Sequence, residues 1–379
     1  MHLECVRALQ CSIEMRRIEL SVYSSELYTE DVKSVYLLSL PWEKLANKVV
    51  LLSGATGMIG SFFTDVIMEK NKQGLDCTIF ALTRSPDKAK NRFLKFVEDE
   101  HLKFIPYDVK NPLDADYIDK VDFVLHLASN THPLQYSTDP IGTITTNIIG
   151  LQNLLDFSVQ HAASRFVFAS SNEVYGENRG DVELFDEGYC GYINCNTLRA
   201  GYPESKRCGE ALCQAYIKQT GLDVVIPRFT RTYGPTMLMS DTKAISQFIK
   251  KGIAGEDIVL KSAGNQYYSY EFVADSVSGL LTTLLLGNAG ESYNIADENS
   301  DIRLKDLAQI IAEAAGRKVI FELPDNVEAA GYSTATKARL DGRKLMSLGW
   351  KPQHDIRTGI LRTMTELKQI YGIFGGSFA

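Results

Sequence analysis

A tyrosine and a lysine four residues apart form the pair in this sequence with the clearest capacity for chemistry. Tyr202 and Lys206 lie in a stretch that Pro203 marks as the first turn of a helix, so both side chains fall on one helix face. An ammonium group beside a phenol favours the phenolate, and we expect Lys206 to lower the pKa of Tyr202. A phenol tuned in this way can act as a general acid or base near neutral pH.

A serine and a glutamate precede this pair by about thirty residues. The apolar run Phe166–Ser170 predicts a buried strand, and Ser171 and Glu173 come directly after it. The carboxyl ends of parallel strands are where such sheets hold ligands. We therefore expect Ser171 to share a substrate hydroxyl with Tyr202, and Glu173 to bring a carboxylate to the same edge. The plainer alternatives are a turn serine and a solvated charge.

Three regularly spaced glycines indicate a dinucleotide site. Gly54, Gly57 and Gly60 follow the strand-like run Val49–Leu52 and open a segment with helical apolar spacing. Gly54 suits a tight turn with positive φ, Gly57 admits a pyrophosphate close to the backbone, and Gly60 lets the helix pack closely on the sheet. The free N–H groups of the helix N-terminus favour phosphate charge. The other turn residues expected to contact the cofactor are Thr56, Met58 and Ile59. A merely structural turn is the alternative.

The residue type at the end of the second predicted strand does not decide between NAD and NADP. A carboxylate there would bind the ribose 2′-hydroxyl, whereas an arginine would favour a 2′-phosphate. The sequence has Arg84 and no carboxylate, so Arg84 either holds a 2′-phosphate or is a solvated cation. Asp108, just after the third predicted strand, is placed to accept a hydrogen bond from adenine, and an ordinary loop or cap role is its alternative.

The bulk composition is that of an ordinary globular protein and argues against several partners. Of the 379 residues, 45% are hydrophobic and 23% are charged, and the net charge of −7 offers no broad basic field to nucleic acid or to an anionic membrane. The seven cysteines are odd in number and include no CxxC pair, which favours free thiols over disulfides or a metal site. With no signal-peptide core and no run of about 18 apolar residues, we expect a cytoplasmic protein.

Apolar runs alternate with helical patterns, which predicts an α/β fold with a doubly wound parallel sheet and a smaller mixed α/β domain. The further runs that predict strands are Cys77–Leu82, Lys103–Tyr107, Phe123–Leu127 and Val224–Pro227. The expected parts are a helical N-terminal extension over 1–47, a dinucleotide-binding domain over 48–234 with 264–290 returning to it, and a substrate domain over 235–263 and 291–379. Trp42 should anchor the extension by packing.

At these motifs the chain resembles a known family. The motifs that carry the resemblance are the glycine turn, Leu125-His126-Leu127-Ala128-Ser129, the Ser171 segment, the Tyr202/Lys206 pair and Arg228-Phe229-Thr230-Arg231-Thr232-Tyr233-Gly234-Pro235. They are similar to those of the extended short-chain dehydrogenase/reductases, the NAD-dependent epimerases and dehydratases of nucleotide sugars. Within that family the resemblance is closest to UDP-glucuronate decarboxylases, followed by nucleotide-sugar 4,6-dehydratases.

The resemblance implies a nucleoside-diphosphate sugar as substrate and a 4-keto sugar as intermediate. Tyr202, helped by Ser171, would take the proton of the sugar 4-hydroxyl while hydride passes from C4 to the nicotinamide. Lys206 would hold the cofactor ribose, and Leu127 and Ala128 would line the cofactor.

The sequence does not decide which chemical step follows oxidation of the sugar at C4. A carboxylate at the position of Glu173 is typical of family members that act at C5, which favours a lyase. Asn172 stands where dTDP-glucose 4,6-dehydratases carry Asp, which weakens that particular assignment. The alternatives are a 4-epimerase, then a net NADP-dependent sugar reductase or a non-catalytic dinucleotide sensor. The resemblance also implies a homodimer in which the helices expected near 140–159 and 203–220 pair across a two-fold axis.

Two departures from the family pattern concern the substrate phosphates. Tyr268 stands where the family usually has an arginine that grips the phosphates, and its presence counts against ordinary decarboxylation. Arg231 stands where the family usually has asparagine. We hypothesise that Arg231 replaces the missing cation, because a diphosphate buried without one carries a large desolvation cost. A salt bridge from Arg231 to a neighbouring acid is the alternative. Arg199 faces either the substrate or the surface.

Overall fold

Eight parallel strands form the main sheet. The computed structural model describes residues 21–114, 118, 120–131, 136, 138–322 and 336–371. The strand order is β11-β7-β5-β4-β1-β2-β3, with β6 paired to β7. The strands are β1 (Val49–Ser53), β2 (Thr78–Thr83), β3 (Leu102–Pro106), β4 (Phe123–His126), β5 (Arg165–Phe168), β6 (Ser170–Ser171), β7 (Val224–Phe229) and β11 (Ser292–Ile295). The direction of winding reverses between β1 and β4, where sheets of this kind open a ligand crevice.

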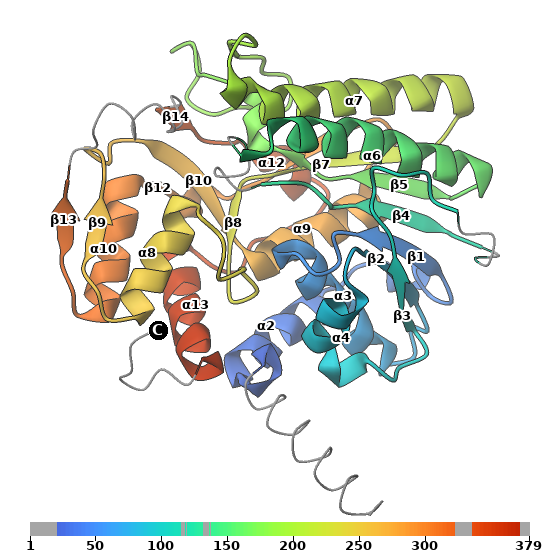
Figure 1. Ribbon diagram of the computed structural model, residues 1–379, viewed down its shortest axis with the longest axis horizontal. Helices are drawn as coiled ribbons and strands as arrows, with labels where there is room; N and C mark the ends of the chain where they lie inside the picture. The colour runs from blue at the N-terminus through green and yellow to red at the C-terminus, as the bar shows by residue number, and fades with distance from the viewer. Residues whose placement is uncertain are drawn as a thin grey trace, which may run out of the picture.

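Helices cover both faces of this sheet (Figure 1), so the predicted doubly wound α/β fold is confirmed. The helices on one face are α6 (Pro140–Gln160) and α7 (Gly201–Thr220), and those on the other are α3 (Met58–Asn71) and α9 (Val273–Leu286). Leu51 of β1 packs into the core under α6 and α7, whereas Val50 and Leu52 pack into the core under α3 and α9. A strand with both faces buried needs apolar residues at successive positions, which is the pattern that β1 has.

A smaller, mixed part of the fold lies beside the main sheet (Figure 1). Its sheet has the order β12-β10-β14, with β8 also paired to β10, and β9 and β13 form a separate pair. The strands are β8 (Arg231–Tyr233), β9 (Ile258–Leu260), β10 (Tyr267–Phe272), β12 (Asp301–Arg303), β13 (Val319–Phe321) and β14 (Lys337–Ala338). The helices are α8 (Ala244–Ile253), α10 (Leu304–Ala315), α12 (Arg343–Met346) and α13 (Ile356–Ile370).

The chain crosses between the two parts at different residues from those expected. β10, which lies in the segment 264–290 expected to return to the main domain, pairs with β12 and β14 of the smaller sheet. β11, expected in the substrate domain, is the edge strand of the main sheet and pairs with β7. Both strands are almost entirely buried, so burial alone did not distinguish the sheet that each one joins.

The described part of the N-terminal extension packs against the main domain. Helix α2 (Glu26–Tyr36) follows the short 3₁₀ helix η1 (Val22–Ser24) and buries Tyr28, Val32 and Val35 at helical spacing. Trp42, in the 3₁₀ helix η2 (Trp42–Lys44), is buried and donates its indole N–H to the carbonyl oxygen of Leu38 at 2.9 Å. The predicted packing anchor is therefore confirmed. Residues 1–20 of the extension lie outside the described residues.

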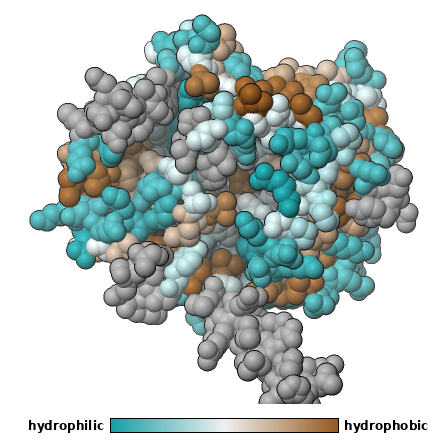
Figure 2. Space-filling model, viewed as in Figure 1, coloured by the Kyte–Doolittle hydropathy of each residue, from teal (hydrophilic) through white to brown (hydrophobic). Residues whose placement is uncertain are grey.

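Hydrophobic side chains are exposed where α6 and α7 lie, along the upper edge of the molecule in Figure 2. Ile141 and Ile144 of α6 are 76% and 38% exposed, and Leu198 in the 3₁₀ helix η5 (Leu198–Ala200) is 71% exposed. A Cβ on Gly201 would lie 3.2 Å from the side chain of Ile144, so the start of α7 adjoins this edge. Apolar side chains exposed together in this way are typical of an interaction surface.

The described residues include free thiols but no metal site and no membrane-spanning helix. The five cysteines that the structure describes are free thiols, three of them exposed. Among the described residues, no group of three histidine, cysteine or carboxylate side chains is arranged to hold a metal ion. No helix in the described ranges is long and apolar enough to cross a membrane. The remaining short 3₁₀ helices are η3 (Leu94–Phe96), η4 (Asn172–Tyr175) and η6 (Glu298–Ser300), and a further short helix is α4 (Pro86–Arg92).

A buried carboxyl pair between α2 and α13 makes the stability of the protein pH-dependent. Burial and the neighbouring Asp31 raise the pKa of Glu366 to about 9, so Glu366 is protonated at neutral pH and donates to Asp31. Between the ordinary value of 4.5 and about 9, the folded state binds one proton more than the unfolded chain. Stability therefore falls as pH rises through this window, by at most about 1.4 kcal/mol for each pH unit.

We expect Glu366→Gln to raise the melting temperature near pH 9 by a few degrees. The substitution removes the titrating proton and keeps an N–H donor for Asp31. The two melting temperatures should converge towards about pH 5, where Glu366 is protonated in folded protein and increasingly so in the unfolded chain. Melting curves across this range check the prediction, and a difference that does not change with pH would contradict it.

Candidate active site

The glycine turn after β1 forms a close-fitting cradle at the crevice between β1 and β4. Gly54 has φ +75°, and a Cβ there would lie 2.7 Å from the backbone nitrogen of Ala128. A Cβ on Gly60 would lie 2.2 Å from the carbonyl oxygen of Gly54. Neither position accepts a larger residue without backbone movement. The two glycines therefore bring the turn, the start of α3 and the loop after β4 into direct contact.

The start of α3 is open to an anionic group. Gly57 is the N-cap residue of α3 and supplies no side-chain cap, so the first N–H groups of the helix are not used by a capping side chain. A Cβ on Gly57 would find only the carbonyl oxygen of Gly54 within 4 Å. Thr56, Met58 and Ile59 are half-buried around the same turn. This cradle fits the pyrophosphate of a dinucleotide, as the glycine spacing predicts.

The loop after β4 is ordered against β1. The Leu127 and Ala128 backbone nitrogens donate to the carbonyl and hydroxyl oxygens of Ser53 at 3.2 and 3.3 Å. The Ser53 hydroxyl also pairs with Nδ1 of His126 at 2.8 Å. Burial lowers the pKa of His126 to about 3, so this histidine is neutral and has a structural part in the crevice. Leu127 and Ala128 thus border the glycine turn, where the resemblance places them.

The two residues expected to read the adenosine half lie at the ends of neighbouring strands. Arg84, directly after β2, is exposed and forms no ion pair with any residue that the structure describes. Asp108 follows β3, and its carboxylate accepts the backbone N–H of Lys110 at 3.1 Å. That contact is the loop role given above as the alternative for Asp108. Contacts of either residue with a cofactor stay predictions.

Tyr202, Ser171 and Lys206 come together at the carboxyl edge of the main sheet, and all three are buried. Ser171, at the end of β6, and Ser129, after β4, lie near enough to the phenol of Tyr202 to favour its phenolate by hydrogen bonding, which lowers its pKa against the larger effect of burial. Nζ of Lys206 donates to the carbonyl oxygen of Ala169 at 2.8 Å. The arrangement places a phenol and a serine hydroxyl side by side beyond the strand ends, where a substrate hydroxyl could bind both.

The prediction that Lys206 lowers the pKa of Tyr202 is wrong. Burial raises the pKa of Tyr202 above its ordinary value, and the charge of Glu173 raises it further. Nζ of Lys206 lies 6.0 Å from the centre of the Tyr202 ring, and burial lowers the pKa of this lysine to about 7. The lysine is therefore too distant and too weakly charged to offset desolvation, and the phenol is protonated.

Glu173 and Arg199 form an ion pair at the edge of this cluster. Nη2 of Arg199 lies 2.7 Å from Oε1 of Glu173, while Nη1 of Arg199 is buried without a hydrogen-bond partner among the described residues. Contact of the half-exposed Arg199 with a substrate stays a prediction. Glu173 is paired rather than simply solvated. Asn172, in the same 3₁₀ helix η4, is buried beside Ser171, whose hydroxyl donates to its side-chain oxygen at 3.5 Å.

Tyr136 is a residue of this cluster that the sequence analysis missed. Its ring stacks on that of Tyr202, with the ring centres 5.1 Å apart and the planes at 24°. The Arg199 guanidinium lies 5.0 Å from the centre of the Tyr136 ring. Ser129 is a second such residue, and its hydroxyl donates to the side-chain oxygen of the buried Asn147 at 2.7 Å. No local pattern marks these residues, because their contacts arise only from the packing of α6 and α7.

Arg231 and Tyr268 also lie together, on paired strands of the smaller sheet. The Arg231 guanidinium stacks on the ring of Tyr268 at 3.6 Å from its centre. Arg231 is half-buried, and its Nη1 is buried with no hydrogen-bond partner among the described residues, none of whose carboxylates lies within ion-pair distance of it. A buried N–H donor left unpaired is costly, so this position favours an anionic ligand. The alternative salt bridge is not formed with any described residue.

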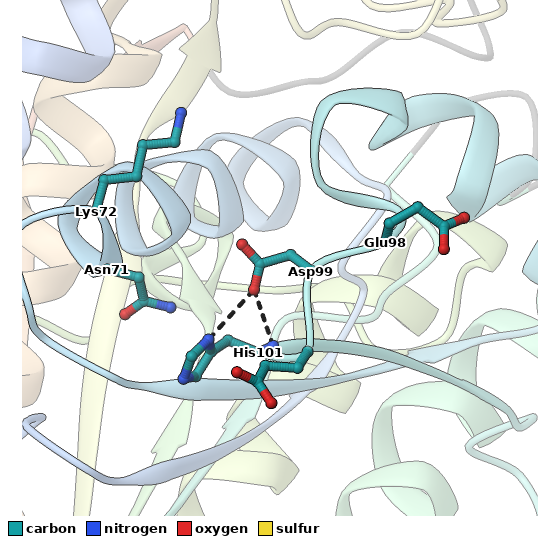
Figure 3. A pocket seen from close by; sticks show the side chains of 6 residues that line it. Asn71, Lys72, Glu98, Asp99 and His101 are labelled. Carbon is teal, nitrogen blue, oxygen red and sulfur yellow. Dashed lines mark hydrogen bonds and ion pairs between the residues drawn. The ribbon is translucent and has the colours of Figure 1, made fainter.

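A shallow surface hollow of about 460 Å³ lies away from this cluster (Figure 3). It is lined by Asn71, Lys72, Glu98, Asp99, Glu100 and His101, from the end of α3 and the turn before β3. Asp99 accepts hydrogen bonds from the backbone nitrogen of His101 at 3.0 Å and pairs with its ring at 3.2 Å. This hollow is at the amino edge of the sheet, opposite the strand ends that carry the predicted site residues.

Comparison with known proteins identifies the family. A profile described as the NAD dependent epimerase/dehydratase family matches residues 50–296, which is more than half of the chain. The chain belongs to the NAD-dependent epimerase/dehydratase family. This membership confirms the resemblance inferred from the motifs, the enzyme class and the nicotinamide dinucleotide for which the family is named.

Relatives within the family are similar over most of their length. UDP-glucuronic acid decarboxylase 1 of Danio rerio is 32% identical over 352 residues, which are 93% of this chain and 78% of that protein. UDP-glucuronic acid decarboxylase 5 of Arabidopsis thaliana is 30% identical over 316 residues, 83% of this chain and 88% of that protein. A crystal structure of a dTDP-glucose 4,6-dehydratase from Streptomyces venezuelae with NAD bound is 25% identical, with a TM-score of 0.72 over 86% of this chain and 99% of that one.

Proposed function

We propose that this member of the family is an NAD-dependent nucleotide-sugar lyase that works through a 4-keto sugar. The observation that carries the proposal is the group formed by Tyr202, Ser171 and Glu173 at the strand ends, beside the glycine cradle. The relatives named above, two UDP-glucuronic acid decarboxylases and a dTDP-glucose 4,6-dehydratase, support a reaction of this class. NADP in place of NAD is not favoured, since Arg84 is the only feature that pointed to a 2′-phosphate.

When bound, NAD supplies an acceptor for the hydride at C4 and can return it within the same turnover. Tyr202 takes the proton of the sugar 4-hydroxyl, and Ser171 orients that oxygen. Because burial keeps the phenol protonated, its action as a base requires added positive charge beside it, which a bound cofactor would supply. Gly54, Gly57 and the start of α3 hold the pyrophosphate.

Glu173 and Arg231 give the proposal its substrate class. A 4-keto group weakens the bonds at C5, and the Glu173 carboxylate, held by Arg199, lies beside Tyr202 where C5 chemistry requires a proton-transfer group. Arg231 holds the diphosphate, since its guanidinium has a buried nitrogen without a partner and no anion beside it among the described residues. Together these roles fit loss of carbon dioxide from a uronate or loss of water from a hexose.

The proposal includes a homodimer, a division of the chain into two binding regions and a cellular compartment. Exposed Ile141, Ile144 and Leu198 support a homodimer formed through α6 and α7. Residues 48–229, with α9 and β11, would bind the cofactor, and β8 with the remainder from 235 onward would bind the nucleotide sugar. The exposed free thiols support a reducing compartment, and we place the protein in the cytoplasm.

Product masses test the proposal. The protein is incubated with UDP-glucuronate, UDP-glucose or dTDP-glucose, in each case once with NAD and once with NADPH, and the product masses are measured by mass spectrometry. Loss of carbon dioxide or of water supports the lyase. Gain of two hydrogens would replace it with the reductase, and an unchanged mass with a new chromatographic peak would replace it with the 4-epimerase. No product from any nucleotide sugar would favour the dinucleotide sensor.

A further inference from the structure

The N-terminal extension joins the two parts of the fold. Helix α2 packs against α3 and α9 of the main domain on one side and against α13 of the smaller part on another. Figure 1 shows α2 and α13 side by side at the lower edge of the molecule. The family match begins only at residue 50, so this helix lies outside it. A helix in this position can fix the smaller part relative to the cofactor crevice.

The contact with α13 is charged and buried. Nη2 of Arg362 in α13 lies 2.6 Å from Oδ1 of Asp31 in α2, and Asp31 is only 1% exposed. His354, just before α13, pairs through Nδ1 with Asp275 of α9 at 2.8 Å, and its Nε2 lies 3.7 Å from Asp31. The His354 ring lies 4.8 Å from the Phe272 ring of β10. One buried network therefore ties α2, α9, α13 and β10 together.

The opposite side of the extension is anchored to the main domain. Asp65 of α3 accepts hydrogen bonds from the hydroxyl groups of Tyr28 and, at 2.7 Å, Tyr23. Arg92 of α4 pairs with the same carboxylate at 2.7 Å. Because buried charged groups such as these are costly to separate, α2 is held rigidly to α3. Helix α2 can therefore fix the position of α13 relative to the main domain.

The contact continues from α13 to the strand that carries Arg231. A Cβ on Gly359 of α13 would lie 2.2 Å from the hydroxyl oxygen of Tyr233, so the helix backbone at Gly359 packs directly on the Tyr233 side chain. Tyr233 is two residues after Arg231 on β8. Arg231 is paired with Tyr270 of β10, and its guanidinium stacks on Tyr268 of the same strand. A shift of α13 would therefore displace the Arg231 guanidinium.

We propose that α2 is a strap that positions Arg231 for the substrate diphosphate, through the Asp31–Arg362 pair and α13. The inference rests on the phosphate role proposed for Arg231. Asp31 and Arg362 are positioning residues, since neither contacts the site. The strap acts on nucleotide-sugar binding through α13 and β8, whereas the glycine cradle is held by its own contacts with the loop after β4.

The test removes the pair as a unit in the full-length protein. In Asp31→Asn/Arg362→Met, neither charge is left buried alone, which protects folding. We expect the dissociation constant of UDP, measured by calorimetry, to rise about threefold to tenfold, with the affinity for NAD unchanged. In an Arg231→Ala background the same pair of substitutions should have no further effect on UDP binding. Arg362→Lys, which keeps the charge, should retain most of the UDP affinity.

A matched control separates positioning from stability. Arg165 and Asp223 form a comparable pair, 2.7 Å apart, at the amino edge of the main sheet. Asp223→Asn/Arg165→Met should lower the melting temperature without changing UDP affinity. Equal effects of the Asp31/Arg362 change with and without Arg231, or an equal effect of the control pair, would overturn the strap alone. Unchanged UDP affinity in Arg231→Ala would overturn the phosphate role and the strap with it.

Discussion

Replacing Tyr202 with phenylalanine is expected to reduce turnover of the nucleotide sugar by about a hundredfold to ten-thousandfold. The substitution removes the phenol hydroxyl beside Ser171, and with it the proposed proton acceptor for the sugar 4-hydroxyl. The ring remains, so its stacking with Tyr136 is retained and binding of the cofactor should be unchanged. Steady-state kinetics with the substrate found by the mass assay, together with a binding titration of NAD, measure both quantities.

A second tyrosine provides the control for this prediction. Tyr293 of β11 is also buried, and its hydroxyl accepts the backbone N–H of Asn288 at 2.9 Å, away from the strand ends that carry the site. Tyr293→Phe should lower stability slightly and leave turnover close to that of the wild type. Turnover in Tyr202→Phe within a few fold of the wild type would contradict the role of the phenol.

Replacing Arg231 with alanine is expected to weaken UDP binding by about tenfold to a hundredfold, the loss typical of a charged hydrogen-bonding group. The guanidinium is stacked on Tyr268 and has one buried nitrogen without a partner among the described residues. NAD binding should be unaffected, since the glycine cradle lies on a different sheet. Calorimetry with UDP and with NAD distinguishes the two sites.

Two further variants sharpen the result for Arg231. Arg231→Lys keeps the charge but loses the planar contact with Tyr268, so it should recover only part of the lost affinity. Tyr268→Leu keeps the guanidinium but removes the surface on which it rests, and a smaller loss of UDP affinity is expected. An Arg231→Ala protein that binds UDP as tightly as the wild type would refute the proposed replacement of the family's usual arginine.

The fold follows from patterns that are local in the sequence. The run Cys77–Leu82 predicted a strand that the structure has at Thr78–Thr83, and the helix expected from Pro203 begins at Gly201. Such runs report burial and period directly. Local patterns do not report which sheet a strand joins, and the predicted sheets of Tyr267–Phe272 and Ser292–Ile295 were wrong. Both are short buried strands, and which edge each one meets is decided by tertiary packing.

The candidate site divides in the same way. Spacing placed Tyr202 and Lys206 on one helix face, and the structure brings them and Ser171 to one edge. Spacing carries no measure of desolvation, however, so the direction of the shift in the pKa of Tyr202 was predicted wrongly. The stacking of Tyr136 on Tyr202 joins residues far apart in sequence, and nothing in either segment encodes that contact.

The most direct test of the central claim is an experimental structure of the protein with NAD and UDP-glucuronate bound. The account predicts the Tyr202 hydroxyl within about 2.6–3.2 Å of the sugar 4-hydroxyl, with C4 of the sugar facing the nicotinamide. A phenol still turned towards the protein interior, far from the reactive carbon of a well-ordered nicotinamide, would contradict it.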